Sequence, residues 1–536
     1  FNTNPHQIRI LKKDPSYLDF ERPLPHPIYY YEKWTAIKGK IFLSLNSSVP
    51  GQGESHVGVI LPQGGFILPS FALYSYLTAD RTQWILHPFR FFSQAFQTQN
   101  LPKPDLSLYF GNRGLFISID GDGFLNPSEV DGQSFSADII YRNFLYPSSF
   151  PHTISFIVGE ISPKYLGSQK SLELARRIAS LPHVEGASHG VAHPLNWKKR
   201  TLAYSHLPGY KFSLHSEIVE GIQYLNKKVF QPYGKKVSVF LWTGDCMPTA
   251  SAFFYLQKID CLNLNGGDSR MDPLYPSICH LSPLARQVGP WIQPYSCSSN
   301  EIPYTEEWHK NFHAFSQVLE TWKNTDGKRL LKPIHLYYHF YAGEKIASIQ
   351  ALKKLYAYLE SHSSSLTPIF TSRYSKMVMD FFRAKIYTTQ IQGKRAYKLE
   401  NMGRISTIRL PFTHLYPHLQ LSKGVVGFCH YKKNLYIYLD RRSQHLLVLT
   451  SQKPQVGYVG KSNYCIDKIK RTKKGLILNV KGYGPGRVEF RGLKPLEGYR
   501  LNQQSIRADK DGRILYQRKK KGDFSTTLKL VRESHK

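Results

Sequence analysis

The feature that most constrains the fold is a short apolar run, residues 115–119, which is followed directly by two aspartates that alternate with two glycines. Apolar runs of this length, bounded by glycine, are typical of a buried strand that ends in a turn. Asp120 and Asp122 are two residues apart, so on an extended backbone both side chains point to the same side. Adjacent carboxylates repel each other unless a cation or a shared proton separates them. The segment therefore predicts a metal ion, a proton-sharing pair or a solvated loop at a strand end.

A second segment, residues 186–194, carries two histidines four residues apart, His189 and His193. On a helical turn, imidazoles at this spacing share a face and can bind the same metal ion. Two histidines and one carboxylate leave open positions on Zn²⁺, which is the arrangement of catalytic rather than structural zinc sites. The second aspartate would then be free to take a proton from a bound water.

The chain is long enough for two to four domains, and its charge is concentrated in one of them. Its 536 residues have a formal charge of +33 and are 41% hydrophobic, which predicts globular domains. Residues 371–536 hold 36 Lys and Arg against 10 Asp and Glu, a charge of +26, so residues 1–370 carry only +7. A basic region is attracted to any polyanion by the same Coulomb interaction. For the C-terminal region we expect an anionic surface or an anionic glycan as partner, and no nucleic acid.

The six cysteines form no CxxC pair, so a cysteine zinc site is not predicted. Cys429 and Cys465 both lie in strand-like segments and could form a disulfide, or all six thiols could be free. No apolar run approaches the roughly 20 residues that a membrane-spanning helix needs. The chain begins at Phe1 without an initiator Met, and we interpret it as a mature form.

Three regions follow from the order of apolar runs and turn residues. Residues 1–105 predict a small α/β unit whose role the sequence does not reveal. Residues 106–384 alternate strands and helices, which predicts a largely parallel sheet or (β/α) barrel. Residues 385–536 contain short strands separated by turns, which predicts an all-β sandwich.

In a barrel of this kind, chemistry gathers at the carboxyl ends of the strands. Several polar residues follow predicted strands of the middle region closely, and these are Asp120, Glu160, Asp245, Asn265 and His339. Their convergence is a stronger indication of a site than any one of them alone.

Four motifs occur in an order that resembles a known family. They are Ser118–Phe124, His189–Pro194, Leu262–Asp268 and Leu336–Tyr341. Together they resemble the polysaccharide deacetylases, carbohydrate esterases related to the NodB-homology group, and most closely the PelA-like branch associated with exopolysaccharide export. The resemblance runs from about residue 83 to residue 374. The glycine between the two aspartates, absent from the commoner deacetylases, also occurs in that branch.

The resemblance implies a distorted (β/α) barrel and a divalent metal, most often Zn²⁺. By motif, Asp122, His189 and His193 are similar to the family's metal ligands. Asp120 is similar to the catalytic base and His339 to the general acid. The implied reaction is hydrolysis of the N-acetyl group of an amino sugar within an exopolysaccharide, in the periplasm or outside the cell. Other polar residues of the region could line the sugar cleft or cap strands, and these are Glu160, Asp245, Asn265 and Asp268.

A non-catalytic protein that binds calcium or a glycan is the alternative. With Ser118 at position one of a calcium loop, Asp120, Asp122 and Glu129 fall at positions three, five and twelve. That interpretation leaves the histidine pair without a role, and position one lacks a carboxylate.

Overall fold

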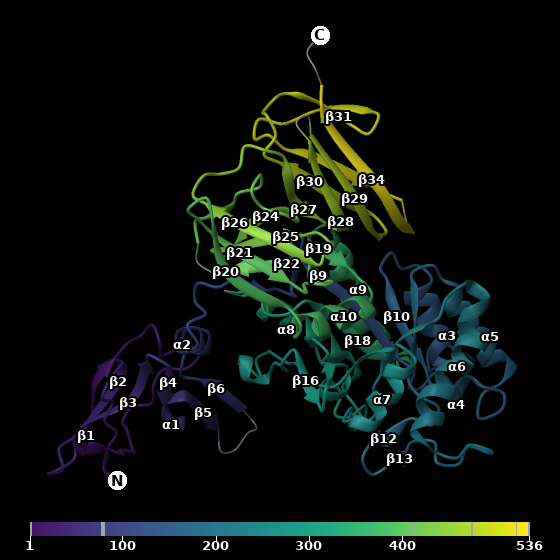
Figure 1. Ribbon diagram of the computed structural model, residues 1–536. Coiled ribbons are helices and arrows are strands. Elements are labelled where there is room, and N and C mark those ends of the chain that lie inside the picture. Colours follow the sequence, from purple (N-terminus) through teal and green to yellow (C-terminus); the bar gives the residue numbers. More distant parts are fainter. Residues whose placement is uncertain are drawn as a thin grey trace. The chain divides into compact units, whose positions relative to one another are not determined.

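The computed structural model describes residues 3–76, 81–327, 329–411, 413–472, 475–520 and 522–533 (Figure 1). By their contacts the residues form two compact units, which are described separately: 1–101 with 270–281, and 102–269 with 282–536. The predicted boundary between a barrel and a β domain, at residues 384 and 385, falls inside the larger unit and stays a prediction.

The smaller unit is built on a four-stranded antiparallel sheet in the order β1-β2-β3-β4. Its strands and helices are β1 (Ile8–Lys13), β2 (Lys40–Ser47), β3 (Gly53–Leu61), β4 (Gly64–Ile67), α1 (Pro69–Ala72), β5 (Leu73–Tyr76), β6 (Arg81–Trp84) and α2 (Pro88–Ala95). Each helix begins with proline, whose fixed φ suits the first turn. Residues 270–281 join this unit through Glu21, whose carboxylate accepts hydrogen bonds from Ser277 Oγ at 2.6 Å and from the Ile278 amide at 2.8 Å.

An eight-stranded sheet forms the centre of the larger unit. Its strands run in the order β15-β14-β11-β10-β9-β18, and β8 and β19 also pair with β9. They are β8 (Leu108–Tyr109), β9 (Asn112–Asp120), β10 (His152–Phe156), β11 (Val184–Ser188), β14 (Val237–Leu241), β15 (Leu262–Leu264), β18 (Ile334–His339) and β19 (Leu366–Pro368). All pairs are parallel except β8 with β9. The α/β class is therefore confirmed. Among the described residues β15 and β18 do not pair, so the sheet is a curled half-barrel that stays open.

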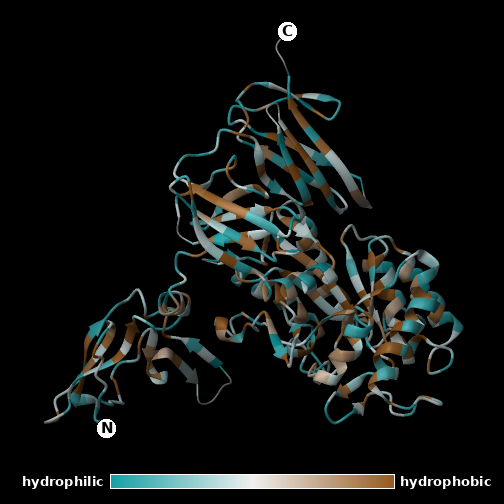
Figure 2. Ribbon diagram, viewed as in Figure 1, coloured by the Kyte–Doolittle hydropathy of each residue, from teal (hydrophilic) through white to brown (hydrophobic). Residues whose placement is uncertain are grey.

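Helices alternate with these strands along the chain. They are α3 (Ser136–Ile140), α4 (Val158–Ile161), α5 (Gln169–Ser180), α6 (Gly221–Leu225), α7 (Ala250–Lys258), α8 (Val318–Asn324), α9 (Ile346–Ser361) and α10 (Thr371–Phe381). The start of α5 is fixed by a capping box between Ser168 and Ser171. The helices show both brown and teal residues in Figure 2, as expected where one face packs on a buried sheet. Short hairpins, β12 (Pro194–Asn196) with β13 (Thr201–Leu202) and β16 (Ala285–Val288) with β17 (Trp291–Pro294), lie in the connections.

From residue 385 onward every described regular element is a strand. The strands are β20 (Lys385–Ile391), β21 (Lys394–Glu400), β22 (Thr407–Leu410), β23 (Tyr416–Pro417), β24 (Val425–Tyr431), β25 (Asn434–Leu439), β26 (Gln444–Thr450), β27 (Tyr458–Ser462), β28 (Cys465–Thr472), β29 (Gly475–Tyr483), β30 (Gly486–Arg491), β31 (Gly498–Leu501), β32 (Gln504–Arg507), β33 (Ile514–Arg518) and β34 (Asp523–Arg532). They form a four-stranded sheet, a five-stranded sheet, and six of the seven strands of a third sheet, whose seventh strand is β7 (Lys103–Pro104). The strand content agrees with the prediction for this region, and the sandwich arrangement itself stays a prediction.

All six cysteines are free thiols, so the disulfide considered between Cys429 and Cys465 does not form. Within the described ranges, no helix has the length and apolar content to cross a membrane.

Candidate metal centre

The carboxyl ends of three parallel strands bring the predicted site residues together. Asp120 is the last residue of β9 and lies opposite His339, the last residue of β18. His189 follows the end of β11, and its amide donates to the Phe156 carbonyl at the end of β10 at 3.0 Å. Residues far apart in the sequence therefore meet at one edge of the sheet.

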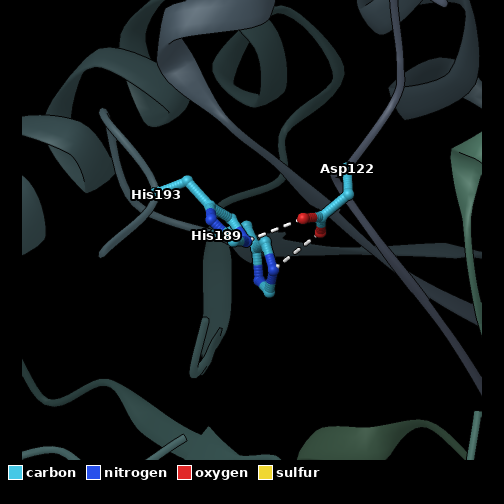
Figure 3. A group of neighbouring side chains, drawn as sticks. All are labelled: Asp122, His189 and His193. Carbon is cyan, nitrogen blue, oxygen red and sulfur yellow. Dashed lines mark ion pairs between the residues drawn. The ribbon is translucent and has the colours of Figure 1, made fainter. Parts of the chain in front are cut away.

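Asp122 faces both histidines of the second motif (Figure 3). Its Oδ2 lies 3.0 Å from His189 Nε2, and its Oδ1 lies 2.7 Å from His193 Nε2. Burial alone would raise the pKa of Asp122, but the two imidazoles outweigh it and hold this pKa well below its usual range. Both imidazoles are buried and present the same nitrogen to the carboxylate.

The helical turn expected for the histidine pair is wrong. His189 and His193 lie in a loop between β11 and β12, in which Gly190 has φ +80° and His193 has φ +51°. These left-handed residues are incompatible with a helical turn. The loop nevertheless brings both Nε2 atoms to one carboxylate, which is the outcome that the spacing predicted.

The donor set fits a small divalent metal. One ligand atom from each of Asp122, His189 and His193 lies within 4.8 Å of the other two, and the same holds for Asp120, Asp122 and His339. Tetrahedral zinc with bonds of about 2.0–2.2 Å separates its ligand atoms by roughly 3.4 Å. The separations at Asp122, 3.0 and 2.7 Å, are shorter than that spacing and within hydrogen-bond range, so the side chains would move apart by roughly 0.4–0.7 Å to hold the ion. As metal ligands, two imidazoles and one carboxylate also leave coordination positions open.

Asp120 is fixed by two donors, Tyr337 on the neighbouring strand β18 and Asn265 directly after β15. Its Oδ2 accepts from Asn265 Nδ2 at 2.8 Å and from Tyr337 OH at 2.9 Å, and it lies 3.6 Å from His189 Nε2. Asp120 Oδ1 is buried and has no hydrogen-bond partner among the described residues. One oxygen therefore orients the side chain, and the other is available to accept a proton.

His339 is held by a carboxylate on its far side. Glu301 Oε2 lies 3.1 Å from His339 Nδ1, and Glu301 Oε1 accepts from the His339 amide at 3.0 Å. The Tyr341 hydroxyl also lies 2.8 Å from Nδ1. Burial would lower the pKa of His339, but the Glu301 carboxylate outweighs it and raises the pKa to about 9. The other ring nitrogen, Nε2, lies 4.0 Å from Asp122 Oδ2 and so faces the metal centre.

Two buried glutamates hold the loops that carry Asp122 and the two histidines. Glu160 accepts from the amides of Gly123 at 3.3 Å and Leu125 at 3.1 Å, directly after Asp122, and from the Tyr204 hydroxyl. Burial raises the pKa of Glu160 to about 7. Since its oxygens are bound to the loop, this side chain positions Asp122 and does not line an open sugar cleft.

Glu217 has the same function for the histidine loop. Its carboxylate accepts from the Val191 amide at 2.7 Å and from the Ala192 amide at 3.1 Å, and also from the Tyr210 hydroxyl. Gly190 is needed beside it, because a Cβ at that position would lie 2.1 Å from Glu217 Oε1. The loop between His189 and His193 therefore wraps around one carboxylate.

The remaining candidates for a sugar cleft differ in exposure. Asn265 is fully buried, and its amide donates to Asp120 and to the Trp242 carbonyl. Asp245 and Asp268 are exposed, and Asp245 Oδ1 accepts from the Met247 amide. Asp245 and Asp268 stay predictions as cleft residues, whereas Asn265 orients the Asp120 carboxylate.

The calcium loop considered as an alternative does not assemble. Ser118 lies inside β9, and its hydroxyl is 2.7 Å from His335 Nε2. Glu129 forms an ion pair with Lys345. The first and twelfth positions of that loop are therefore engaged elsewhere, and the carboxylates of Asp120 and Asp122 face histidines.

Sequence reasoning missed the side chains that support this centre: Tyr204, Tyr210, Glu217, Glu301 and Tyr337. Glu301 had a signal, because Asn300–Glu301 falls within the stretch that resembles the deacetylases. Tyr337 precedes His339 by two residues on β18, so period-two alternation puts both on one face of the strand. Glu217 had none, since it lies in an ordinary-looking helical segment.

Comparison with known proteins gives only distant structural likeness. No family model matches the sequence, and no curated protein matches it. One similar structure is BA3943, a CE4 family pseudoenzyme from Bacillus anthracis, with 10% identity, a TM-score of 0.29, and 48% of this chain aligned to 64% of that chain. Another is the Bc1960 peptidoglycan N-acetylglucosamine deacetylase, with 9% identity, a TM-score of 0.30, and 50% of this chain aligned to 90% of that chain. A third is 4-alpha-glucanotransferase from Thermococcus litoralis, with 8% identity, a TM-score of 0.32, and 78% of this chain aligned to 99% of that chain. At such values the likeness does not decide the activity.

Proposed function

We propose that this chain is a metal-dependent hydrolase of the polysaccharide deacetylase type, which removes N-acetyl groups from an amino-sugar polymer. The observation that carries the proposal is the convergence at Asp122. His189 Nε2 and His193 Nε2 lie 3.0 and 2.7 Å from its carboxylate, and Asp120 and His339 stand nearby. The resemblance of the four sequence motifs to that family supports the same reaction.

Asp122, His189 and His193 would hold the metal, and Zn²⁺ suits two imidazoles and a carboxylate best. When bound, it would polarise the amide carbonyl and make a neighbouring water more acidic. The protein supplies a buried, oriented donor set, which Glu160 and Glu217 hold from behind through the loop amides.

Asp120 is the general base of the proposed reaction. Its Oδ2 is held by Asn265 and Tyr337, so the side chain cannot rotate away, and Oδ1 has no other partner among the described residues. The carboxylate accepts a proton from the attacking water as the bond between water oxygen and acyl carbon forms.

His339 is the general acid. Glu301 holds its Nδ1 and keeps the imidazole protonated, and Nε2 faces the centre. As the carbon–nitrogen bond breaks, Nε2 gives its proton to the leaving nitrogen, so the products are acetate and a free amine. The base lies on β9 and the acid on β18. The proton taken from water and the proton given to the leaving nitrogen are therefore handled by different side chains.

The test is acetate release from N-acetylated hexosamine oligomers, for example chitooligosaccharides and N-acetylgalactosamine oligomers, with wild type, Asp120→Asn and His339→Ala. Removing a general acid or base costs typically 10²- to 10⁴-fold in rate. Wild type should release acetate, and both variants should be slowed by at least roughly 100-fold with unchanged metal content. An Asp260→Asn variant, in which only an exposed side chain before the amino end of β15 changes, is the matched control and should keep the rate within a few-fold. No acetate from any glycan with fully metal-loaded protein would contradict the proposal.

The finer assignments are part of the same proposal. An exopolysaccharide substrate and a role in polysaccharide modification or export, in the periplasm or outside the cell, follow from the resemblance to the PelA-like branch. The charge of +26 on residues 371–536 supports an anionic surface or glycan as partner of the C-terminal region. The deacetylated product is itself cationic and should not be retained there.

A further inference from the structure

A second cleft, of about 280 Å³, lies between loops of the α/β part and the edge of the C-terminal strands. On one side it is lined by Ser149 and Phe150, which precede β10, and by Ser363 and Ser364, which follow α9. The metal centre is at the carboxyl ends of β9, β11 and β18. This cleft is therefore at the opposite, amino end of the sheet and does not belong to the site described above.

The other side of the cleft is strongly basic. Arg487, Arg518 and Lys519 line it, and none of its lining residues is acidic. Arg487 and Lys519 form no ion pair with any acidic residue of the described chain. Arg487 Nε is also shielded from solvent without a hydrogen-bond partner in that part of the chain. A shielded cationic donor without a partner is costly, and an anion in the cleft would supply the missing acceptor.

The backbone around Arg487 is fixed before any ligand arrives. The Arg487 amide donates to Asn463 Oδ1 at 3.1 Å, and Asn463 Nδ2 donates to the Leu366 carbonyl at 2.6 Å. One asparagine thus joins the two sides of the cleft. Across the sheet, Arg487 on β30 lies opposite Gln517 on β33, so both side chains share one face. Arg518 Nη1 donates to the Gly484 carbonyl at 2.8 Å, which holds this second guanidinium in place.

The uncharged groups in the cleft indicate a sugar and not a bare anion. The side chains of Ser363, Ser364 and Gln517 form no hydrogen bond with other described residues. Hydroxyls and a primary amide both donate and accept, as sugar hydroxyl groups do, whereas an oxyanion only accepts. The wall also includes the ring of Tyr483 and the proline at 485, which offer an apolar surface to a sugar face. The cleft volume is just below the range of pockets for drug-sized ligands and suits one sugar residue.

We propose that this cleft binds a sugar residue that carries an oxyanion, with Arg487 as the principal contact to the charged group. Because the cleft is remote from the metal centre, the proposal does not depend on the deacetylase function. Such a site would let the protein hold an acidic glycan, whereas the same positive charge would repel a cationic glycan.

The test is calorimetric titration of the full chain with D-glucuronic acid, glucose 6-phosphate, glucose, glucosamine and inorganic phosphate at fixed ionic strength. We expect binding of glucuronic acid or glucose 6-phosphate, at least tenfold weaker binding of glucose and inorganic phosphate, and none of glucosamine. Whichever of the two acidic sugars binds with the higher affinity shows whether the cleft prefers a carboxylate or a phosphate. Phosphate binding as strongly as both acidic sugars would reveal a plain anion site and overturn the sugar assignment.

Arg487→Gln removes the charge that faces the cleft, and Arg507→Gln removes an equal charge from the exposed strand β32 outside it. A charge-assisted hydrogen bond is worth enough that Arg487→Gln should weaken binding roughly tenfold or more, and Arg507→Gln less than twofold. Lys519→Gln changes an exposed side chain of the same cleft and should also weaken binding of the acidic sugar, so it tests the proposal if Arg487→Gln unfolds. Equal weakening by the Arg507 variant, or none by the Arg487 and Lys519 variants, would contradict the proposal.

Discussion

Glu217 should control the metal affinity of the proposed site through its hydrogen bonds to the loop amides between His189 and His193. Its two oxygens accept from the Val191 and Ala192 amides and from the Tyr210 hydroxyl, so it sets the path of the chain between His189 and His193. Replacement by glutamine keeps the shape and one acceptor oxygen, and puts an NH₂ group where the other oxygen was. At least one of these donors then loses its acceptor.

The magnitude follows from what is lost. A hydrogen bond to a charged group contributes about 1.5–3 kcal/mol, and changes to groups that orient metal ligands typically cost 10- to 100-fold in metal affinity. Glu217→Gln should therefore weaken Zn²⁺ binding by about 1.4–2.7 kcal/mol, that is 10- to 100-fold. The assay is titration of metal-free protein with Zn²⁺ against a competing chelator, with the fold checked by circular dichroism.

Glu185 offers a matched control. It lies on the same strand as the start of the histidine loop, and its carboxylate accepts from Thr153 Oγ1 at 2.9 Å, from the Ser372 amide at 3.2 Å and from the Ser372 hydroxyl. Glu185→Gln should lower the free energy of unfolding and leave Zn²⁺ affinity within twofold. A folded Glu217→Gln protein with wild-type affinity, or an equal loss in both variants, would refute the reasoning.

Three further predictions concern protonation and backbone geometry. Glu301 raises the pKa of His339 to about 9. Glu301→Gln should therefore lower that pKa and move the alkaline limb of the pH profile of kcat to lower pH by at least about one unit. An alkaline limb that stays at the same pH would disprove this function of the carboxylate. Burial lowers the pKa of His152 to about 3, whereas an unfolded histidine titrates near 6.5, so stability should fall as pH drops from 6.5 towards 3, by about 2 kcal/mol at pH 5. Denaturant unfolding of His152→Gln should lack this decrease, and an identical pH dependence in both proteins would be inconsistent with a neutral buried imidazole. Gly190→Ala should reduce both the free energy of unfolding and metal affinity, since φ is +80° and the Cβ would meet the carboxylate that holds the loop. Gly209 has φ +66° and open space around an added Cβ, so Gly209→Ala should lower the free energy of unfolding without changing metal affinity. Denaturant unfolding and metal titration of both variants would show the difference.

Local sequence signals predicted the α/β elements well, because each is a separate apolar run. The strand expected over residues 115–119 lies within β9, which runs from Asn112 to Asp120, and the sheet is mainly parallel. The histidine loop was predicted less well. Spacing indicated that His189 and His193 meet, but not that Gly190 and Glu217 shape a loop in place of a helical turn. Such a carboxylate comes from a distant part of the chain, and only the tertiary fold brings it to the loop.

The resemblance to deacetylases implies the proposed ligands, base and acid, whereas the supporting residues are recognisable only in the folded chain. Asn265, which the sequence places either in a sugar cleft or at a strand end, is buried and donates its side-chain amide to Asp120. Glu160 likewise turned out to hold the loop after Asp122. Period-two alternation places Tyr337 beside His339, yet nothing local shows that its hydroxyl reaches Asp120 from the neighbouring strand.

The most direct test of the account is the metal content of the purified chain, by elemental analysis of wild type and His189→Ala in parallel. The geometry at Asp122 predicts one equivalent of a divalent transition metal, most simply zinc, in wild type, and its loss in the variant while the fold is retained. Lys198→Ala, which changes an exposed side chain of the following segment, should keep the metal. Wild-type protein that binds no transition metal after incubation with excess Zn²⁺, or that binds calcium regardless of His189, would contradict the central claim.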